Sequence, residues 1–212
     1  MAHTLTQLIL AARQSADMEG DPLCEDPEIT TYLNDGLRRL YLAYLLLHTD
    51  AYLTSSPFTV AGTATTAPLP ATFVRERGLD FFVNGRWKPV RVFQWRNRGS
   101  RDAGRRTYRV DALVRLAPDD LDMSGSYRLW YHPTAPVLVN YGDTLDAQMD
   151  LYSDYVFNYA AAQMLVKAKL SPASQLAMAS FVYERMEAEA PRRQSEPAQA
   201  PDADADEDED WA

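Results

Sequence analysis

Residues 26–48 read DPEITTYLNDGLRRLYLAYLLLH, and this stretch decides the fold. Asp26 is predicted to cap a helix, with Pro27 at the first helical position, where its missing N–H is not needed. Apolar residues then recur at steps of four and three, which is the spacing of one helix face. They are Ile29, Leu33, Leu37, Leu40, Tyr44 and Leu47.

The second half of this helix, Leu40 to Leu47, is apolar without a break. Eight residues are far too few to span a bilayer, which needs about 20. A helix that is apolar all round must be covered all round, either by its own domain or by a neighbouring subunit. We therefore expect residues 26–48 to form the central helix of a helical bundle.

Three further helices are predicted around it. The first runs from Thr4 to about Met18, and Thr4 and Gln7 have the spacing of a capping box. Near Asp146 helical spacing returns and continues to about residue 170, and Ser171-Pro172 ends that helix and starts the last one. The predicted core faces of the third and fourth helices are Leu151, Tyr155, Tyr159, Ala162 and Val166, then Leu176, Ala179, Tyr183 and Met186.

The region between the helix pairs has the composition of β-structure. Asn84-Gly85 lies between two alternating segments, which is the strongest local signal for a two-residue hairpin, and Pro89 favours an edge position for its second strand. A second hairpin is predicted around Asp111-Ala112, and Tyr127 to His132 forms a last strand.

The predicted fold class is α+β: a four-helix bundle with an inserted β-rich region and a disordered acidic C-terminal tail. The bundle comprises residues 1–50 and 140–190, the insertion 51–139 and the tail 191–212. The tail is predicted to be disordered because it has too few apolar side chains to offset the entropy lost on ordering.

The net charge of −9 is unevenly distributed. Between Arg75 and Arg115 there are 12 basic and 4 acidic residues, whereas the chain from Glu196 onward has 8 acidic residues and no basic one. An acidic chain is a poor general binder of nucleic acid, because phosphate contacts dominate that affinity. Neither an N-terminal signal nor a membrane span is visible, so we expect synthesis in a cytoplasm.

No pattern typical of a catalytic, cofactor or metal site is found. The three histidines, His3, His48 and His132, lie in different elements, and no pair has the spacing of metal ligands. Cys24 is the single cysteine, and the neighbouring acids Glu25 and Asp26 disfavour its thiolate. We therefore expect a protein that is not an enzyme and binds no cofactor.

The best candidate for a binding surface is the basic segment after the first hairpin, QWRNRGSRDAGRR at 94–106. Three interpretations stay open: a solvated loop, contact with phosphate, or docking on an acidic protein surface, including that of a neighbouring copy. Trp211, the one large apolar residue of the tail, is a second candidate. The candidate interface residues are Trp95, Arg96, Arg98, Arg101, Arg105, Arg106, Arg109 and Trp211.

The sequence resembles the head-to-tail adaptor, or connector, proteins of tailed bacteriophages over about residues 4–190. The likeness rests on moderate matches in a fixed order, none of them diagnostic alone. The matching stretches are ARQSADMEG at 12–20, EITTYLNDGLRRLYLAYL at 28–45, AYLTSSPFTVAGTATTAPLPATF at 51–73, GRWKPVRVF at 85–93 and YRLWYHPTAPVLVN at 127–140.

The resemblance implies a structural protein of the virion, located at the head–tail junction. Such a subunit forms a ring, usually of twelve copies, beneath the portal protein. The ring extends the DNA channel without reading DNA sequence, and it provides the docking platform for the next tail component, such as a nozzle, stopper or tail-tube protein. The alternative function is a nucleic-acid-binding regulator that uses residues 96–109, which would bind DNA with a steep dependence on salt.

Overall fold

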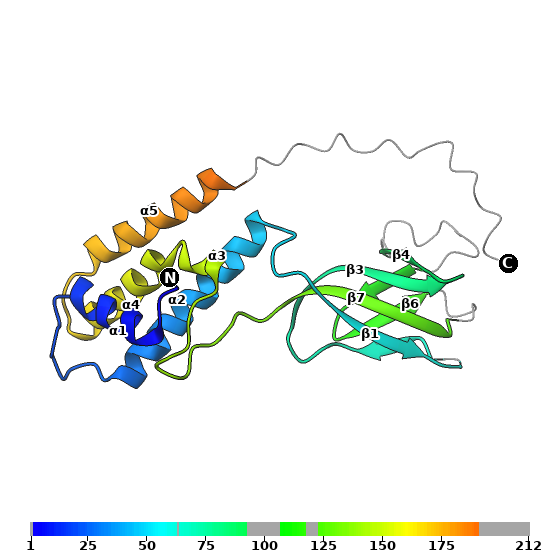
Figure 1. Ribbon diagram of the computed structural model, residues 1–212, viewed down its shortest axis with the longest axis horizontal. Coiled ribbons are helices and arrows are strands. Elements are labelled where there is room, and N and C mark those ends of the chain that lie inside the picture. Colours follow the sequence, from blue (N-terminus) through cyan, green and yellow to red (C-terminus); the bar gives the residue numbers. More distant parts are fainter. Residues whose placement is uncertain (1, 63, 93–106, 118–122, 191–212) are drawn as a thin grey trace.

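The computed structural model describes residues 2–62, 64–92, 107–117 and 123–190. Helices gather at one end of the long axis and a β-sheet at the other (Figure 1). The described residues form five helices: α1 (Leu5–Ser15), α2 (Asp26–Leu47), α3 (Ala147–Asp150), α4 (Ser153–Lys167) and α5 (Ala173–Glu189). They also form seven strands: β1 (Thr54–Val60), β2 (Thr66–Pro68), β3 (Phe73–Val83), β4 (Arg86–Val92), β5 (Thr107–Val110), β6 (Leu113–Ala117) and β7 (Gly125–Pro133).

Helix α2 is the centre of the helical part, as its apolar period predicted. It packs against α1, α4 and α5, and Ile29, Leu33, Leu37 and Leu40 are completely buried. The capping box at the start of α1 is confirmed, because Thr4 accepts from the Gln7 backbone N–H while the Gln7 side chain accepts from the Thr4 N–H. These contacts fix the two N-terminal helices in one core.

The predicted cap of α2 is wrong by one residue. Glu25 is the N-cap residue and its side chain makes no capping hydrogen bond, so Pro27 lies one position further into the helix than expected. The carboxylate of Asp26 instead accepts a hydrogen bond from Arg13 of α1, with 2.8 Å between Nη2 and Oδ1. A contact between helices has therefore replaced the local cap.

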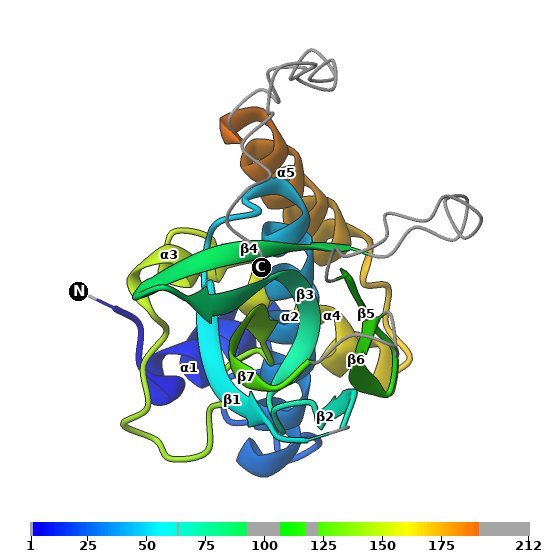
Figure 2. The same cartoon turned by 90° about the vertical axis from the view of Figure 1, so that its right-hand side faces the viewer.

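The sheet has seven strands in the order β1-β7-β3-β4-β5-β6-β2. All neighbours are antiparallel except β4 and β5, which are parallel, and β1 contacts β2, so that the sheet is nearly closed into a barrel (Figure 2). Its interior is a second hydrophobic core, separate from that of the helices. The largest fully buried side chains of this core are Tyr108, Tyr127, Leu79, Met123 and Leu129.

Both predicted hairpins are confirmed. Asn84 and Gly85 have φ values of 49° and 76°, the left-handed conformation that a two-residue turn between β3 and β4 requires. The second hairpin pairs β5 with β6 around Asp111. The expected edge position of Pro89 is wrong, since β4 lies inside the strand order; pairing with β5 begins only at Arg91, so Pro89 interrupts no ladder hydrogen bond there.

The predicted fold class is wrong. In place of a four-helix bundle with an inserted β-rich region, the described chain has five helices and a mixed, nearly closed sheet with its own core. The local patterns identified hairpins, because each hairpin has a turn signal between its strands. The pairing of β4 with β5 and of β2 with β6 brings together segments that have no such signal between them. The division into independent domains stays a prediction, and the tail 191–212 lies outside the described residues.

The third predicted helix is in fact two, α3 and α4, and its predicted core face is confirmed only in part, since Ala162 is completely buried. Leu151 lies at the break, and it and Val166 are 68% and 55% exposed. Helix α4 packs against α1, α2 and α5 at once, so residues on several of its faces are buried and the apolar period is blurred. In α5, likewise, Leu176 is exposed and Val182 is buried in its place.

Two chain segments connect the helices with the sheet, one leading from α2 into β1 and one from β7 toward α3 (Figure 1). The hydroxyl of Tyr41 donates to the carbonyl of Pro133 at 3.0 Å, and Tyr52 donates to Asp146, the N-cap of α3. Arg77 of β3 pairs with Asp50 at 3.3 Å. The junction is therefore held by side chains from both parts.

His132 lies at this junction and is 1% exposed, with its Nδ1 buried and without a hydrogen-bond partner among the described residues. Burial lowers the pKa of His132 from the ordinary 6.5, and the positive charges of Arg77 and Arg75 lower it further. Below about pH 6.5 His132 is therefore protonated in the unfolded chain but still neutral in the folded chain. The free energy of unfolding thus decreases as the pH falls toward the folded-state pKa.

We therefore expect His132→Gln to lose less stability than the parent protein between pH 7.5 and 5.5. Urea unfolding at the two pH values measures this, and the difference between the two proteins cancels the titration of all other groups. Equal losses in both proteins would mean that His132 takes up its proton without disturbing the junction.

Candidate interaction surfaces

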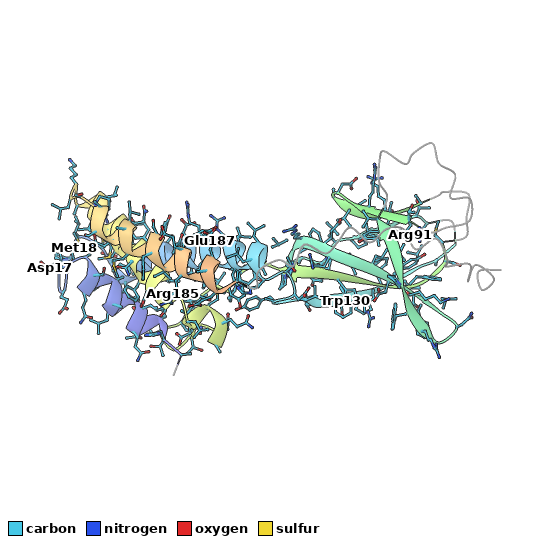
Figure 3. The ribbon with its side chains drawn as sticks, turned by 90° about the horizontal axis from the view of Figure 1, so that it is seen from above. Asp17, Met18, Arg91, Trp130, Arg185 and Glu187 are labelled. Carbon is cyan, nitrogen blue, oxygen red and sulfur yellow. The ribbon has the colours of Figure 1, made fainter. Side chains whose placement is uncertain are left out.

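An arginine held between two tryptophans lies on the outer face of the sheet. Side chains alternate along β7, so Tyr127, Leu129 and Tyr131 point into the core while Arg128 and Trp130 point outward. The guanidinium carbon of Arg128 lies 4.5 Å from the ring centre of Trp87 and 4.6 Å from that of Trp130. Figure 3 marks Trp130 in the sheet part of the molecule.

Asp80 of β3 completes this cluster. Its Oδ2 accepts from Arg128 Nη2 at 2.8 Å and from the Trp130 indole N–H at 2.7 Å. The pairing follows from the register, because Asp80 lies opposite Arg128 on β7 and Pro89 on β4. The charge of Arg128 is thus balanced, and the cluster offers flat aromatic surface.

The aromatic surface continues onto Phe82, whose ring centre is 5.1 Å from that of Trp87. Phe82 and Trp87 are 42% and 36% exposed. Exposed tryptophan and arginine in a fixed arrangement are typical of the anchors of protein–protein interfaces. The Arg128 cluster is therefore a candidate docking surface that the sequence analysis missed; the alternation in YRLWY at 127–131 was its signal.

We expect Arg128→Lys to lower the free energy of unfolding by about 1–2 kcal/mol, since lysine cannot stack between two rings and donate to Asp80 through a planar fork. The tryptophan emission of the folded state should also change, because two of the indoles lose the planar guanidinium stacked on them. Arg86→Lys, at an exposed arginine at the start of β4, is the matched control and should change neither quantity. An unchanged stability of the Arg128 variant would contradict a stabilising role of the cluster.

Of the eight predicted interface residues, the structure describes only Arg109, and the others lie outside the described residues. Arg109 of β5 faces Arg115 of β6 directly across the ladder, and both side chains are about half exposed, at 52% and 44%. Asp111 in the turn lies 3.6 Å from Arg109 and 3.1 Å from Arg115. One carboxylate is thus shared by two guanidinium groups.

Arg91 of β4 lies one strand further along, opposite Thr107 of β5. Arg91 is exposed. Residues two apart on a strand point to the same face, so Thr107 and Arg109 share a face of β5, and Arg91, as the neighbour of Thr107, lies on that face too. We call Arg91, Arg109 and Arg115 the arginine row. Of its three members only Arg109 belongs to the basic surface predicted from the sequence, whose role stays a prediction.

The helical end carries exposed apolar side chains on three helices. The residues, all more than two-fifths exposed, are Leu42 and Leu46 of α2, Val166 of α4, Leu170 just after it, and Leu176, Met178 and Phe181 of α5. Between Lys169 and Glu184 the chain has no charged residue at all. The apolar second half of α2 is thus only partly covered by its own chain.

A second exposed apolar segment precedes α3. Val137, Val139 and Tyr141 are 66%, 71% and 59% exposed, while Leu138 between them is buried. Asn34 of α2 holds this segment, because its side chain donates to the Leu138 carbonyl at 2.9 Å and accepts from the Leu138 N–H at 2.8 Å. The valines are therefore presented outward on a fixed backbone.

The described residues contain no group of three or more His, Cys, Asp or Glu that could hold a metal ion. None of the described helices is long and apolar enough to cross a membrane. The buried thiol of Cys24 has a raised pKa, chiefly because of burial.

A family model described as SU10 adaptor protein matches residues 3–205. No curated protein matches the chain.

Proposed function

The chain belongs to the SU10 adaptor protein family, a family of phage adaptors, and we propose that it is a structural protein of a phage virion that joins the head to the tail. In this proposal the protein has no catalytic role. It sits as a ring of copies, twelve in number, beneath the portal protein. The ring continues the DNA channel and receives the next tail component.

The observation that carries the proposal is the family match, which covers 203 of the 212 residues and so includes both ends of the molecule. Two structural features support it. The elongated subunit has chemically different ends, as a part that joins two different partners requires (Figure 1). The exposed apolar side chains of α2, α4 and α5 also provide surface for neighbouring copies in a ring.

The charge of the helical part also fits a channel for DNA. The described residues 2–50 and 134–190 hold six Lys and Arg against fifteen Asp and Glu. An acidic wall repels the phosphate backbone, so DNA could slide past it without adhering.

Mixing the purified protein with the portal ring of the same phage tests the proposal. We expect a complex in which about twelve copies bind one portal, as measured by native mass spectrometry or by cryo-electron microscopy. Failure of the two proteins to associate, together with normal tail attachment in particles that lack this protein, would overturn it.

A pair of variants on α5 tests the lateral contacts in the same assay. Phe181→Asp places a charge on the exposed apolar surface and should lower the number of copies bound, without unfolding the protein, because Phe181 is 60% exposed. Ala188→Asp adds the same charge near the end of α5, beside Glu187 and Glu189, and should leave the ring intact. Equal binding by both variants would mean that this surface of α5 is not the lateral contact.

A further inference from the structure

The described molecule has two electrically opposite ends. The sheet part, residues 51–62, 64–92, 107–117 and 123–133, holds eight Lys and Arg against three Asp and Glu, in contrast to the acidic helical part. Figure 3 shows Asp17 at the far end of the helices and Arg91 in the sheet. An acidic segment that can reach the sheet would therefore be attracted to it and repelled by the helices.

The arginine row is the place on the sheet where such a segment would bind. Arg91, Arg109 and Arg115 come from three adjacent strands and share one outward face. Like charges directly opposite each other destabilise a ladder, and within the described part of the chain Asp111 is the one carboxylate that pairs with Arg109 and Arg115. Further carboxylates on this face would therefore stabilise the sheet.

The chain itself contains such a segment. The last 17 residues, 196–212, include eight acids, no base, and one large apolar residue, Trp211. Phe82 and Trp87, which are partly exposed on β3 and β4, offer aromatic surface on the same outward face, with Trp87 four residues before Arg91 on β4. The composition of residues 196–212 thus matches both the charge and the apolar character of this face.

The described chain ends where this segment can reach the row. The C-terminal end of α5 is the end nearer the sheet, and α5 lies on the same side of the molecule as β4 in both views (Figures 1 and 2). Eleven residues separate Ala190 from Asp202, the first acid of the DADADEDED run, and an extended chain over that stretch spans roughly 40 Å.

We propose that in the free protein the acidic segment 196–212 binds the arginine row of its own sheet. Binding within one chain needs only weak ion pairs, because a short tether gives an effective concentration in the millimolar range. Nucleic acid is the less suitable occupant, since the fifteen acids of the helical part and the acidic segment itself both repel phosphate. The contact goes beyond the proposed function and does not depend on it.

The acidic segment and an incoming partner would compete for the same surface. While the segment is bound, the row and the neighbouring aromatic surface are occupied, and a partner that binds either one more tightly displaces it. The acidic segment is then released at the moment of docking and becomes available to a basic surface of that partner.

Zero-length crosslinking of the full-length protein with a carbodiimide tests the proposal, because this reagent joins carboxylates to lysine amines that they touch. Arg91→Lys places an exposed amine in the row. Arg38→Lys, the matched control, places an amine at an exposed position of helix α2. We expect peptides of 196–212 linked to residue 91 and not to residue 38, in protein that runs as a monomer.

Raising the salt concentration from about 0.02 to about 0.5 M should lower the crosslink yield at residue 91 roughly fivefold, because exposed charges are screened over a few Å at high salt. Replacing the eight acids of the segment by their amides in the Arg91→Lys background should abolish the crosslink while keeping chain length and fold. Equal yields at residues 91 and 38, or a yield insensitive to salt, would overturn the proposal. Crosslinks found only between two chains would show binding to a neighbouring copy and would refute binding within one chain.

Discussion

Replacing Leu37 by alanine is expected to lower the free energy of unfolding by about 2–5 kcal/mol, the usual cost of a cavity left by leucine in a core. Leu37 is 0% exposed in the middle of α2, the helix around which the helical core is built. Neighbours on α1 and α4 are fixed by their own helices, so they cannot collapse into the space. The effect is large relative to a typical total stability of about 5–15 kcal/mol.

Leu42→Ala is the matched control, since it makes the same chemical change in the same helix at a side chain that is 43% exposed. It should cost less than about 1 kcal/mol, because leucine and alanine have similar helix propensities and little burial is lost. Chemical denaturation of the two variants side by side measures the difference. Similar losses at both positions would mean that the second half of α2 is as fully covered in solution as the first.

Replacing Gly36 by valine is expected to destabilise the protein by about 1–3 kcal/mol through overpacking. At Gly36 helix α2 lies close against α4, since an added Cβ would lie 3.0 Å from Tyr159 Cδ1 and 3.3 Å from the backbone oxygen of Val156. The Tyr159 ring cannot turn aside freely, because its hydroxyl donates to Asp35 at 2.7 Å. The two helices must therefore move apart or lose that hydrogen bond.

Gly142→Val is the control for this substitution. An added Cβ at Gly142 meets nothing within 4 Å, and Gly142 is not among the glycines with positive φ. Its stability should change by less than about 0.5 kcal/mol in the same thermal and chemical unfolding experiments. A Gly36 variant as stable as this control would show that α2 and α4 can separate at little cost.

Elements with a local signal were predictable from the sequence. The period of α2, the Thr4 capping box and the Asn84-Gly85 turn each depend on residues a few positions apart, and each is confirmed. The wrong predictions concern features that depend on contacts between segments far apart in the sequence. Whether Leu176 or Val182 of α5 is buried depends on which face meets α4, and no pattern within α5 contains that information.

The same reason explains the wrong fold class. The parallel contact of β4 with β5 and the contact of β2 with β6 turn two hairpins and a strand into one nearly closed sheet. The candidate surface was predicted mainly from charge. Charge selected Arg109, whose role stays a prediction, but it missed Arg128, because what distinguishes Arg128 is its contact with Trp87 and Asp80 on two other strands. Composition can find a charge, but it cannot show what that charge is stacked upon.

The two connections at the junction determine how the molecule would respond to a pulling force along its long axis. The segments next to Thr54 of β1 and Tyr131 of β7 lead to the helical part, and these two residues are paired neighbours in the sheet. Tension between the two ends would therefore load β1 and β7 in the same direction, so the ladder between them would not be sheared. The load would pass instead to the long pairing of β7 with β3 and to the hydrogen bond between Tyr41 and Pro133. Under load the junction should thus extend before either β1 or β7 leaves the sheet.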